Sequence, residues 1–159
     1  MTPTVDAAAA RPAAPVRYPA LAALGPTTHA LLRVGAALLF MEHGLQKLFG
    51  FFGGIGPQGG TVQLMSLFGL AGVLEFVGGI LLLIGLFTRP VALILAGEMI
   101  VAFFMAHFPR GGFPIQNMGE LALLYFLVFL FLLGNGAGPW SVDAARGARG
   151  ISTRDVAPV

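Results

Sequence analysis

Four apolar segments, separated by turns rich in glycine and proline, limit the folds open to this chain. They cover residues 28–49, 64–87, 90–108 and 119–134. A helix needs about 20 mainly apolar residues to cross a bilayer. Of the 159 residues, 57% are hydrophobic and only 10% are charged, whereas roughly 25% are charged in a soluble domain. We therefore predict an all-α integral membrane protein, folded as a bundle of four transmembrane helices.

The expected domain organisation follows from these segments. Residues 1–27 form an Ala/Pro-rich disordered tail without the apolar core of a cleavable signal peptide. Residues 28–143 form the four-helix transmembrane domain, and residues 144–159 form a flexible tail. The chain has no cysteine, which excludes disulfides and thiolate-ligated metal centres within it.

Basic residues gather on one side of the predicted topology. With four spans, the two tails and the second turn share a side that holds Arg11, Arg17, Arg89, Arg146, Arg149 and Arg154. The positive-inside rule therefore places both termini in the cytoplasm, where the tails meet anionic membrane lipids. Arg33 and Arg89 are interpreted as snorkelling residues at cytoplasmic helix ends. The net charge of +2 gives no indication of nucleic-acid binding.

Each predicted helix carries one glutamate, whereas all three aspartates lie outside the predicted helices. Ionisable groups inside a membrane are costly and usually functional. Glu75 lies between Gly72 and Gly79, small residues that let helices approach closely, so it is expected to face the interior. We predict a polar pocket or proton relay in the outer half of the bundle, facing the periplasm or outer leaflet and formed by Glu42, His43, Lys47, Glu75, Glu98, His107 and Glu120.

The same set of residues suggests two other interpretations. The same residues could form buried ion pairs that only fix the register of the helices. A di-iron centre would need two Glu-x-x-His motifs, and the chain has none. No metal site is therefore predicted.

A series of short motifs gives the chain a family resemblance. They are RxG at 33–35, HGxxKxFG at 43–50, ExxGG at 75–79, GLFTRP at 85–90, GEM at 97–99, NxGELA at 117–122 and GxGPWSVD at 136–143, with His107 between the GEM and NxGELA motifs. In this order and over this length, they resemble the DoxX family of small bacterial membrane proteins.

The resemblance implies a multi-pass inner (plasma) membrane protein of bacteria with a link to redox chemistry, because relatives include a subunit of a thiosulfate:quinone oxidoreductase. We expect the pocket to bind a quinone or another small redox-related ligand, such as an oxyanion. Alternatively, the chain serves as the membrane subunit of a quinone-linked oxidoreductase whose catalytic centre lies on a partner subunit.

Other functions stay open at this point. The sequence shows no nucleotide, haem, flavin or iron–sulfur motif, so no intrinsic cofactor is predicted and no activity is assigned to the chain alone. A non-enzymatic membrane anchor or assembly subunit is one alternative. A transporter of protons or small solutes, with Glu75 and Glu98 as relay groups, is another. The sequence leaves homo-oligomer formation undecided.

Overall fold

The computed structural model describes residues 18–152, with side chains described as far as residue 147. This part of the chain is helical and has no strand, apart from one isolated bridge between Ile55 and Gly60. The α-helices are α1 (Pro19–Ala22), α2 (Gly25–Phe49), α3 (Leu67–Ile84), α4 (Thr88–Ala102), α5 (Pro114–Asn117), α6 (Glu120–Asn135) and α7 (Val142–Ser152). The predicted all-α class is confirmed.

Within residues 18–152, three helical stretches are long and apolar enough to cross a membrane. They are Pro19–Phe49, Leu67–Ile84 and Thr88–Arg110, and the shorter apolar helix α6 follows them. The third stretch extends α4 through a π-helical turn, η2 (Phe103–His107), and a 3-10 turn, η3 (Phe108–Arg110). A membrane protein with several apolar helices is thus confirmed. The bundle of four transmembrane helices and the cytoplasmic location of the termini stay predictions.

Helical structure extends into both segments that were expected to be tails. Helix α1 begins at Pro19, and α7 occupies much of the segment after residue 143. Residues 1–17 and 153–159 lie outside the described residues, so their expected disorder stays a prediction.

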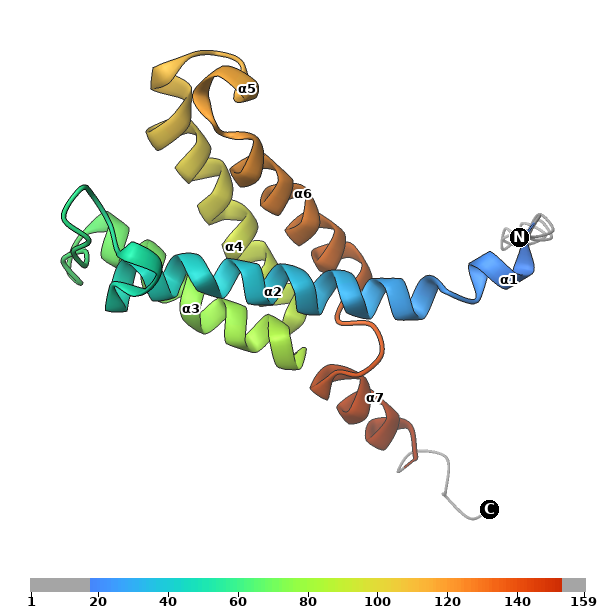
Figure 1. Ribbon diagram of the computed structural model, residues 1–159. Helices are drawn as coiled ribbons and strands as arrows, with labels where there is room; N and C mark the ends of the chain where they lie inside the picture. The colour runs from blue at the N-terminus through green and yellow to red at the C-terminus, as the bar shows by residue number, and fades with distance from the viewer. Residues whose placement is uncertain (1–17, 153–159) are drawn as a thin grey trace, which may run out of the picture.

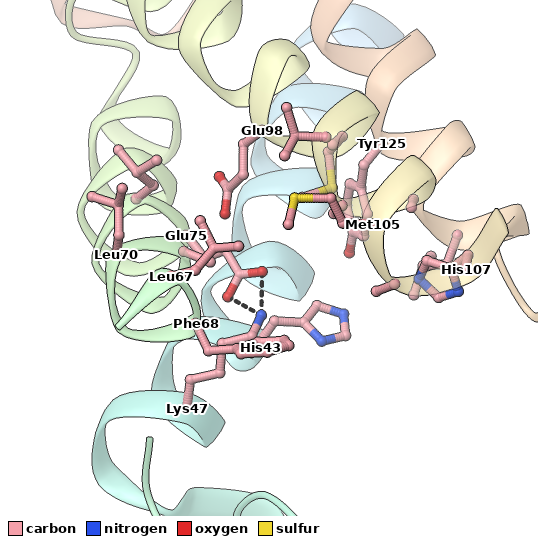
Figure 2. A pocket seen from close by; sticks show the side chains of 18 of the residues that line it. His43, Lys47, Leu67, Phe68, Leu70, Glu75, Glu98, Met105, His107 and Tyr125 are labelled. Carbon is pink, nitrogen blue, oxygen red and sulfur yellow. Dashed lines mark hydrogen bonds and ion pairs between the residues drawn. The ribbon is translucent and has the colours of Figure 1, made fainter. Parts of the chain in front are cut away.

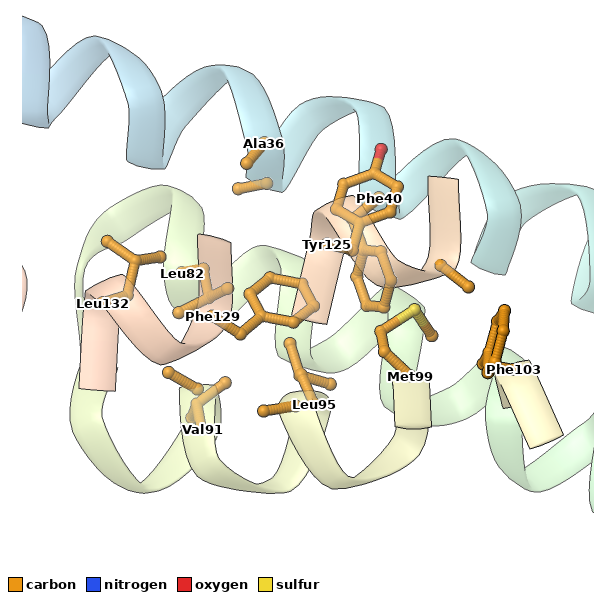
Figure 3. Packing of buried hydrophobic residues seen from close by; sticks show 14 residues of the cluster. Ala36, Phe40, Leu82, Val91, Leu95, Met99, Phe103, Tyr125, Phe129 and Leu132 are labelled. Atoms are coloured by element: carbon orange, nitrogen blue, oxygen red, sulfur yellow. The ribbon is translucent and has the colours of Figure 1, made fainter. Parts of the chain in front are cut away.

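The four long helices form two pairs that diverge (Figure 1). Helix α2 packs mainly against α3, and α4 packs mainly against α6. The pairs meet near the α3–α4 turn, which we call the closed end, and separate toward the other ends of these helices, which we call the open end. The buried apolar cluster joins the pairs and includes Phe40, Leu82, Leu95, Phe129 and Leu132 (Figure 3).

Glycine allows the close contact between α2 and α3. A Cβ atom on Gly44 would lie 2.9 Å from the carbonyl oxygen of Gly72, too close for any larger residue without movement of the helices. About two helical turns after Gly72 on α3, Gly79 packs directly against Met41. The predicted small-residue stripe therefore faces α2, and Glu75 within it is buried as expected, with 4% of its surface exposed.

Arg33 corrects the interpretation made from sequence. Its side chain is fully buried, with 0% exposure, and does not snorkel. Nε donates to the carbonyl of Ala137 at 2.8 Å, and Nη1 donates to the carbonyls of Leu82 and Leu83 at 2.6 and 2.7 Å. Nη2 donates to the carbonyl of Trp140 at 2.9 Å. The last carbonyls of a helix lack hydrogen-bond partners and carry the negative end of the helix dipole. The buried guanidinium at the end of α3 donates hydrogen bonds to these carbonyls and also places a positive charge at the negative end of the dipole.

Two further side chains connect helix ends at the closed end. Arg89 is exposed, and its Nη1 donates to the carbonyls of Leu133 and Gly134 at the end of α6. The carboxylate of Asp143 accepts the backbone N–H groups of Phe87 and Thr88 at 2.9 and 2.8 Å, at the start of α4. The segment after α6 is therefore hydrogen-bonded to the α3–α4 turn through side chains.

Candidate functional site

A cavity of about 920 Å³ lies between the two helix pairs toward the open end. Its wall is mostly apolar, and Figure 2 shows the polar side chains directed into it from different helices. The ionisable or hydroxyl-bearing lining residues are His43, Lys47, Glu75, Glu98, His107, Arg110 and Tyr125. The cavity lies in the half of the helices remote from the α3–α4 turn, which is the half where the sequence predicted a pocket.

Five of the seven candidate residues from the sequence line this cavity, and two do not. Glu42 and Glu120 are exposed and lie off the cavity wall. Glu42 precedes His43 in α2, and adjacent helical residues point about 100° apart. Glu120 is the first residue of α6, where its side chain is free to turn away from the helix pairs. Both are removed from the candidate site.

Lys47 and Glu75 form an ion pair that joins α2 to α3. The Lys47 ammonium lies 2.5 Å from each oxygen of the Glu75 carboxylate. The pair sits beside the close contact of Gly44 and Gly72, because one helical turn separates each charged residue from its neighbouring glycine. Each charge is thus neutralised by the other at the inner wall of the cavity.

Glu98 has no such partner. Both oxygens of its carboxyl group are buried, and neither accepts nor donates a hydrogen bond within the part of the chain that the structure describes. Its side chain extends from α4 toward Glu75 on the facing helix pair (Figure 2). Leaving a buried polar group unsatisfied costs about 1–3 kcal/mol, and more if the group is charged. The fold gains nothing evident from Glu98 in return.

Tyr125 is a site residue that sequence reasoning missed. It is buried on α6, and its ring lies 6.2 Å from the ring of His43 in a perpendicular arrangement. The chain has two tyrosines, and Tyr125 is the only residue with a hydroxyl in the apolar run of α6. A lone hydroxyl in such a run was a signal that could have identified it.

His107 closes the π-helical turn η2 at the far end of the cavity. Its Nδ1 lies 3.1 Å from the carbonyl oxygen of Asn117, so Nδ1 carries the proton and donates it to that bond. Asn117 is itself buried and donates from Nδ2 to the carbonyl of Gly111 at 2.6 Å. Turns of π-helix occur frequently at functional sites. The asparagine holds the loop that orients His107.

The arrangement suits hydrogen bonding and proton exchange better than metal binding. In residues 18–152, no three His, Asp or Glu side chains are grouped so that they could hold a metal ion. The cavity instead offers one free carboxyl, a phenol and two imidazoles on an apolar wall.

Known proteins resemble this chain over most of its length. The model of the DoxX family matches residues 28–108. An uncharacterised protein of Haemophilus influenzae is 46% identical over 121 residues, which cover 72% of this chain and 87% of the relative. An uncharacterised membrane protein of Mycobacterium tuberculosis is 31% identical, with coverages of 77% and 83%.

The inner membrane protein YqjF of Escherichia coli is 32% identical over 120 residues, with coverages of 70% and 85%. No solved structure matches the chain. The family match and the membrane relatives agree with the apolar helices described above, and the chain belongs to the DoxX family.

Proposed function

We propose that the cavity binds a small, largely apolar molecule with a polar head, of the quinone class. The observation that carries the proposal is the buried Glu98 carboxyl, which has no protein partner in the described residues and lies on the cavity wall. Ligand pockets typically have volumes of 300–1,000 Å³ and apolar walls with a few convergent polar groups. The cavity of about 920 Å³ fits this description.

The charges on the wall favour a neutral head over an anion. Lys47 is already paired with Glu75, so its charge is not free for a ligand. Glu98 lies near this pair and adds a second carboxyl beside it. The other cation of the lining, Arg110, lies on η3 beyond His107, at the far end of the cavity. An oxyanion would bring further negative charge to two carboxyls in a low-dielectric site, where like charges repel strongly. A quinone or quinol head offers carbonyl or hydroxyl groups instead.

Each polar group then has a simple role. The Glu98 carboxyl exchanges a hydrogen bond with one oxygen of the head, and it holds or releases the proton there. Tyr125 and His43 lie together on the neighbouring wall and offer further hydrogen bonds. The chain supplies binding and proton exchange in this proposal, and the electron-transfer centre belongs to a partner subunit in the inner membrane.

Substitution of Glu98 in the full chain tests the proposal. The protein is reconstituted in lipid nanodiscs and titrated with decylubiquinone and with its reduced form. We expect Glu98→Leu to weaken the binding of both by about tenfold, the loss of one good hydrogen bond to a buried acid. Glu120→Gln is the matched control, because it changes a glutamate of the adjacent helix that lies off the cavity. Equal affinities for the wild type and Glu98→Leu would contradict the proposal.

A transporter of protons or small solutes is the second candidate, and the same residue favours it. A membrane-embedded carboxyl without a protein partner is a typical relay group. Proton flux into liposomes separates the candidates: flux that disappears in Glu98→Gln supports transport. Quinone binding without flux supports the first proposal. If neither assay responds to Glu98, a membrane anchor remains as the function.

A further inference from the structure

Two aromatic side chains project from the closed end of the molecule. Phe87 in the α3–α4 turn is 55% exposed, and Trp140 before α7 is 69% exposed. Both have left-handed backbone conformations, with φ of 51° and 54°. This region is unfavourable for residues with a large side chain, and such conformations persist where the surrounding structure imposes them, often at functional sites.

The surrounding structure does impose them. The N–H group of Phe87 donates to the Asp143 carboxylate at 2.9 Å. The carbonyl of Trp140 accepts from the buried Arg33 guanidinium at 2.9 Å. The charged side chains of Asp143 and Arg33 therefore hold the backbone of the two residues whose rings are exposed. The rings themselves have no role in the apolar core, so their presentation outward needs another reason.

Arg146 completes the group. Its guanidinium lies over the Phe87 ring, 5.5 Å from the ring centroid. In the part of the chain that the structure describes, the charge of Arg146 acts on the nearby Asp143 carboxylate, but its guanidinium forms no ion pair or hydrogen bond, so the edge of the guanidinium stays available. Beside it lies a hollow of about 420 Å³, lined by Ile84, Trp140, Ser141, Val142, Ala145 and Arg146.

We propose that Phe87, Trp140 and Arg146 form a binding site for the headgroup of an anionic phospholipid. The group lies where the apolar helices α3, α4 and α6 end or begin, the depth at which lipid headgroups meet a transmembrane protein. Tryptophan is enriched at this level of a membrane. The free edge of a guanidinium matches the oxygens of a phosphate in two parallel hydrogen bonds. The exposed side chains of Ile84 and Phe87 then cover the first acyl carbons.

The single tryptophan of the chain reports on this site directly. The full-length protein is reconstituted in nanodiscs that contain phosphatidylglycerol or phosphatidylcholine brominated on the acyl chain near the headgroup, each at the same fraction. Trp140 fluorescence is then quenched by whichever lipid occupies the site. We expect about fivefold enrichment of phosphatidylglycerol, the effect of one arginine near an anionic surface. The enrichment should shrink in 1 M NaCl because salt screens the charge.

Variants decide whether the site is specific. Arg146→Gln should bring the quenching by the two lipids to the same level. Arg110→Gln removes the same charge at the opposite end of the helices and should leave the enrichment intact. Equal quenching in the wild type, or enrichment that survives Arg146→Gln, would overturn the proposal; an acidic protein partner would be the next occupant to test.

A second variant, Phe87→Gly, tests the role of the ring without destabilising the fold. Phe87→Gly removes the ring beneath the guanidinium and relieves the left-handed strain of the backbone. It should therefore lower the enrichment without lowering the thermal stability. Full enrichment in Phe87→Gly would show that the ring takes no part in lipid binding.

Discussion

Substitution of Arg33 by glutamine should strongly destabilise the protein. The guanidinium lies without exposure between the end of α3 and the segment that follows α6, and it donates to backbone carbonyls of both. Glutamine is shorter, has one amide group and cannot reach these acceptors together. The change therefore removes the hydrogen bonds that connect the end of α3 to the segment after α6. These two parts of the closed end lie about 50 and 105 residues away from Arg33 along the chain.

The magnitude follows from the carbonyls that lose their donor. The carbonyl of Leu82 also accepts from the N–H of Gly85 and keeps that bond. Within the described residues, the carbonyls of Leu83, Ala137 and Trp140 have the guanidinium as their side-chain donor. A buried acceptor left without a donor costs about 1–3 kcal/mol. Removal of Arg33 also removes the free-energy cost of burying its charge, which offsets part of this loss. We therefore expect the free energy of unfolding to fall by about 3–5 kcal/mol.

Arg89 provides the matched control for this measurement. It also donates to the last carbonyls of a helix, but it is exposed, so water can replace it. Arg89→Gln should cost at most about 1 kcal/mol. The free energy of unfolding is measured by circular dichroism in mixed micelles with increasing SDS. Losses of similar size in the two variants would refute the reasoning, because burial would then make no difference.

Three more predictions concern stability. Gly44→Ala should cost about 1–3 kcal/mol because it forces α2 away from α3, whereas Gly35→Ala, with nothing within 4 Å, should be neutral or stabilising in the same thermal unfolding assay. Glu98→Leu should raise the free energy of unfolding by about 1–2 kcal/mol because it removes an unsatisfied buried group. Glu75→Leu should lower the free energy of unfolding by about 3–5 kcal/mol because it leaves Lys47 unpaired. Equal effects of the two variants would contradict the conclusion that Glu75 is paired and Glu98 is not. Partial burial raises the pKa of Asp143, but hydrogen bonds from backbone N–H groups of α4 outweigh this and hold the pKa below its ordinary 3.8. The carboxylate therefore stabilises the fold above that pH and loses its contribution as the pH falls further, so an acid titration should destabilise the wild type more than Asp143→Asn.

The helices could be predicted because lipid imposes a strong pattern on sequence. Long apolar runs, interrupted at Gly-Pro-rich turns, gave boundaries within a few residues of those observed. The glycines beside Glu75 correctly indicated a buried face, because only small residues permit such close packing. Periodicity relates residues on one helix to each other, but it does not give the rotation of that helix in the bundle. This is why His43 and Lys47 were identified together with Glu42, which faces outward.

Contacts between distant segments could not be predicted in the same way. An arginine near the end of an apolar helix has the same local sequence whether it snorkels or is buried. What decided the position of Arg33 was the presence of free carbonyls in segments 49 to 107 residues away. Likewise, the sequence predicts a flexible tail over residues 144–159, yet α7 runs from Val142 to Ser152.

The polar side chains are satisfied very differently at the two ends of the molecule. At the closed end, Arg33, Arg89 and Asp143 all bind backbone groups of neighbouring helices, so this end is fixed by the chain itself. Toward the open end, the Lys47–Glu75 pair joins only α2 to α3, and Glu98 on α4 faces that pair without a hydrogen bond in the described structure. The proposed ligand would therefore bridge the two helix pairs where the protein does not bridge them. Binding at Glu98 would then be coupled to the separation of the pairs, whereas the closed end, already satisfied, would stay as it is.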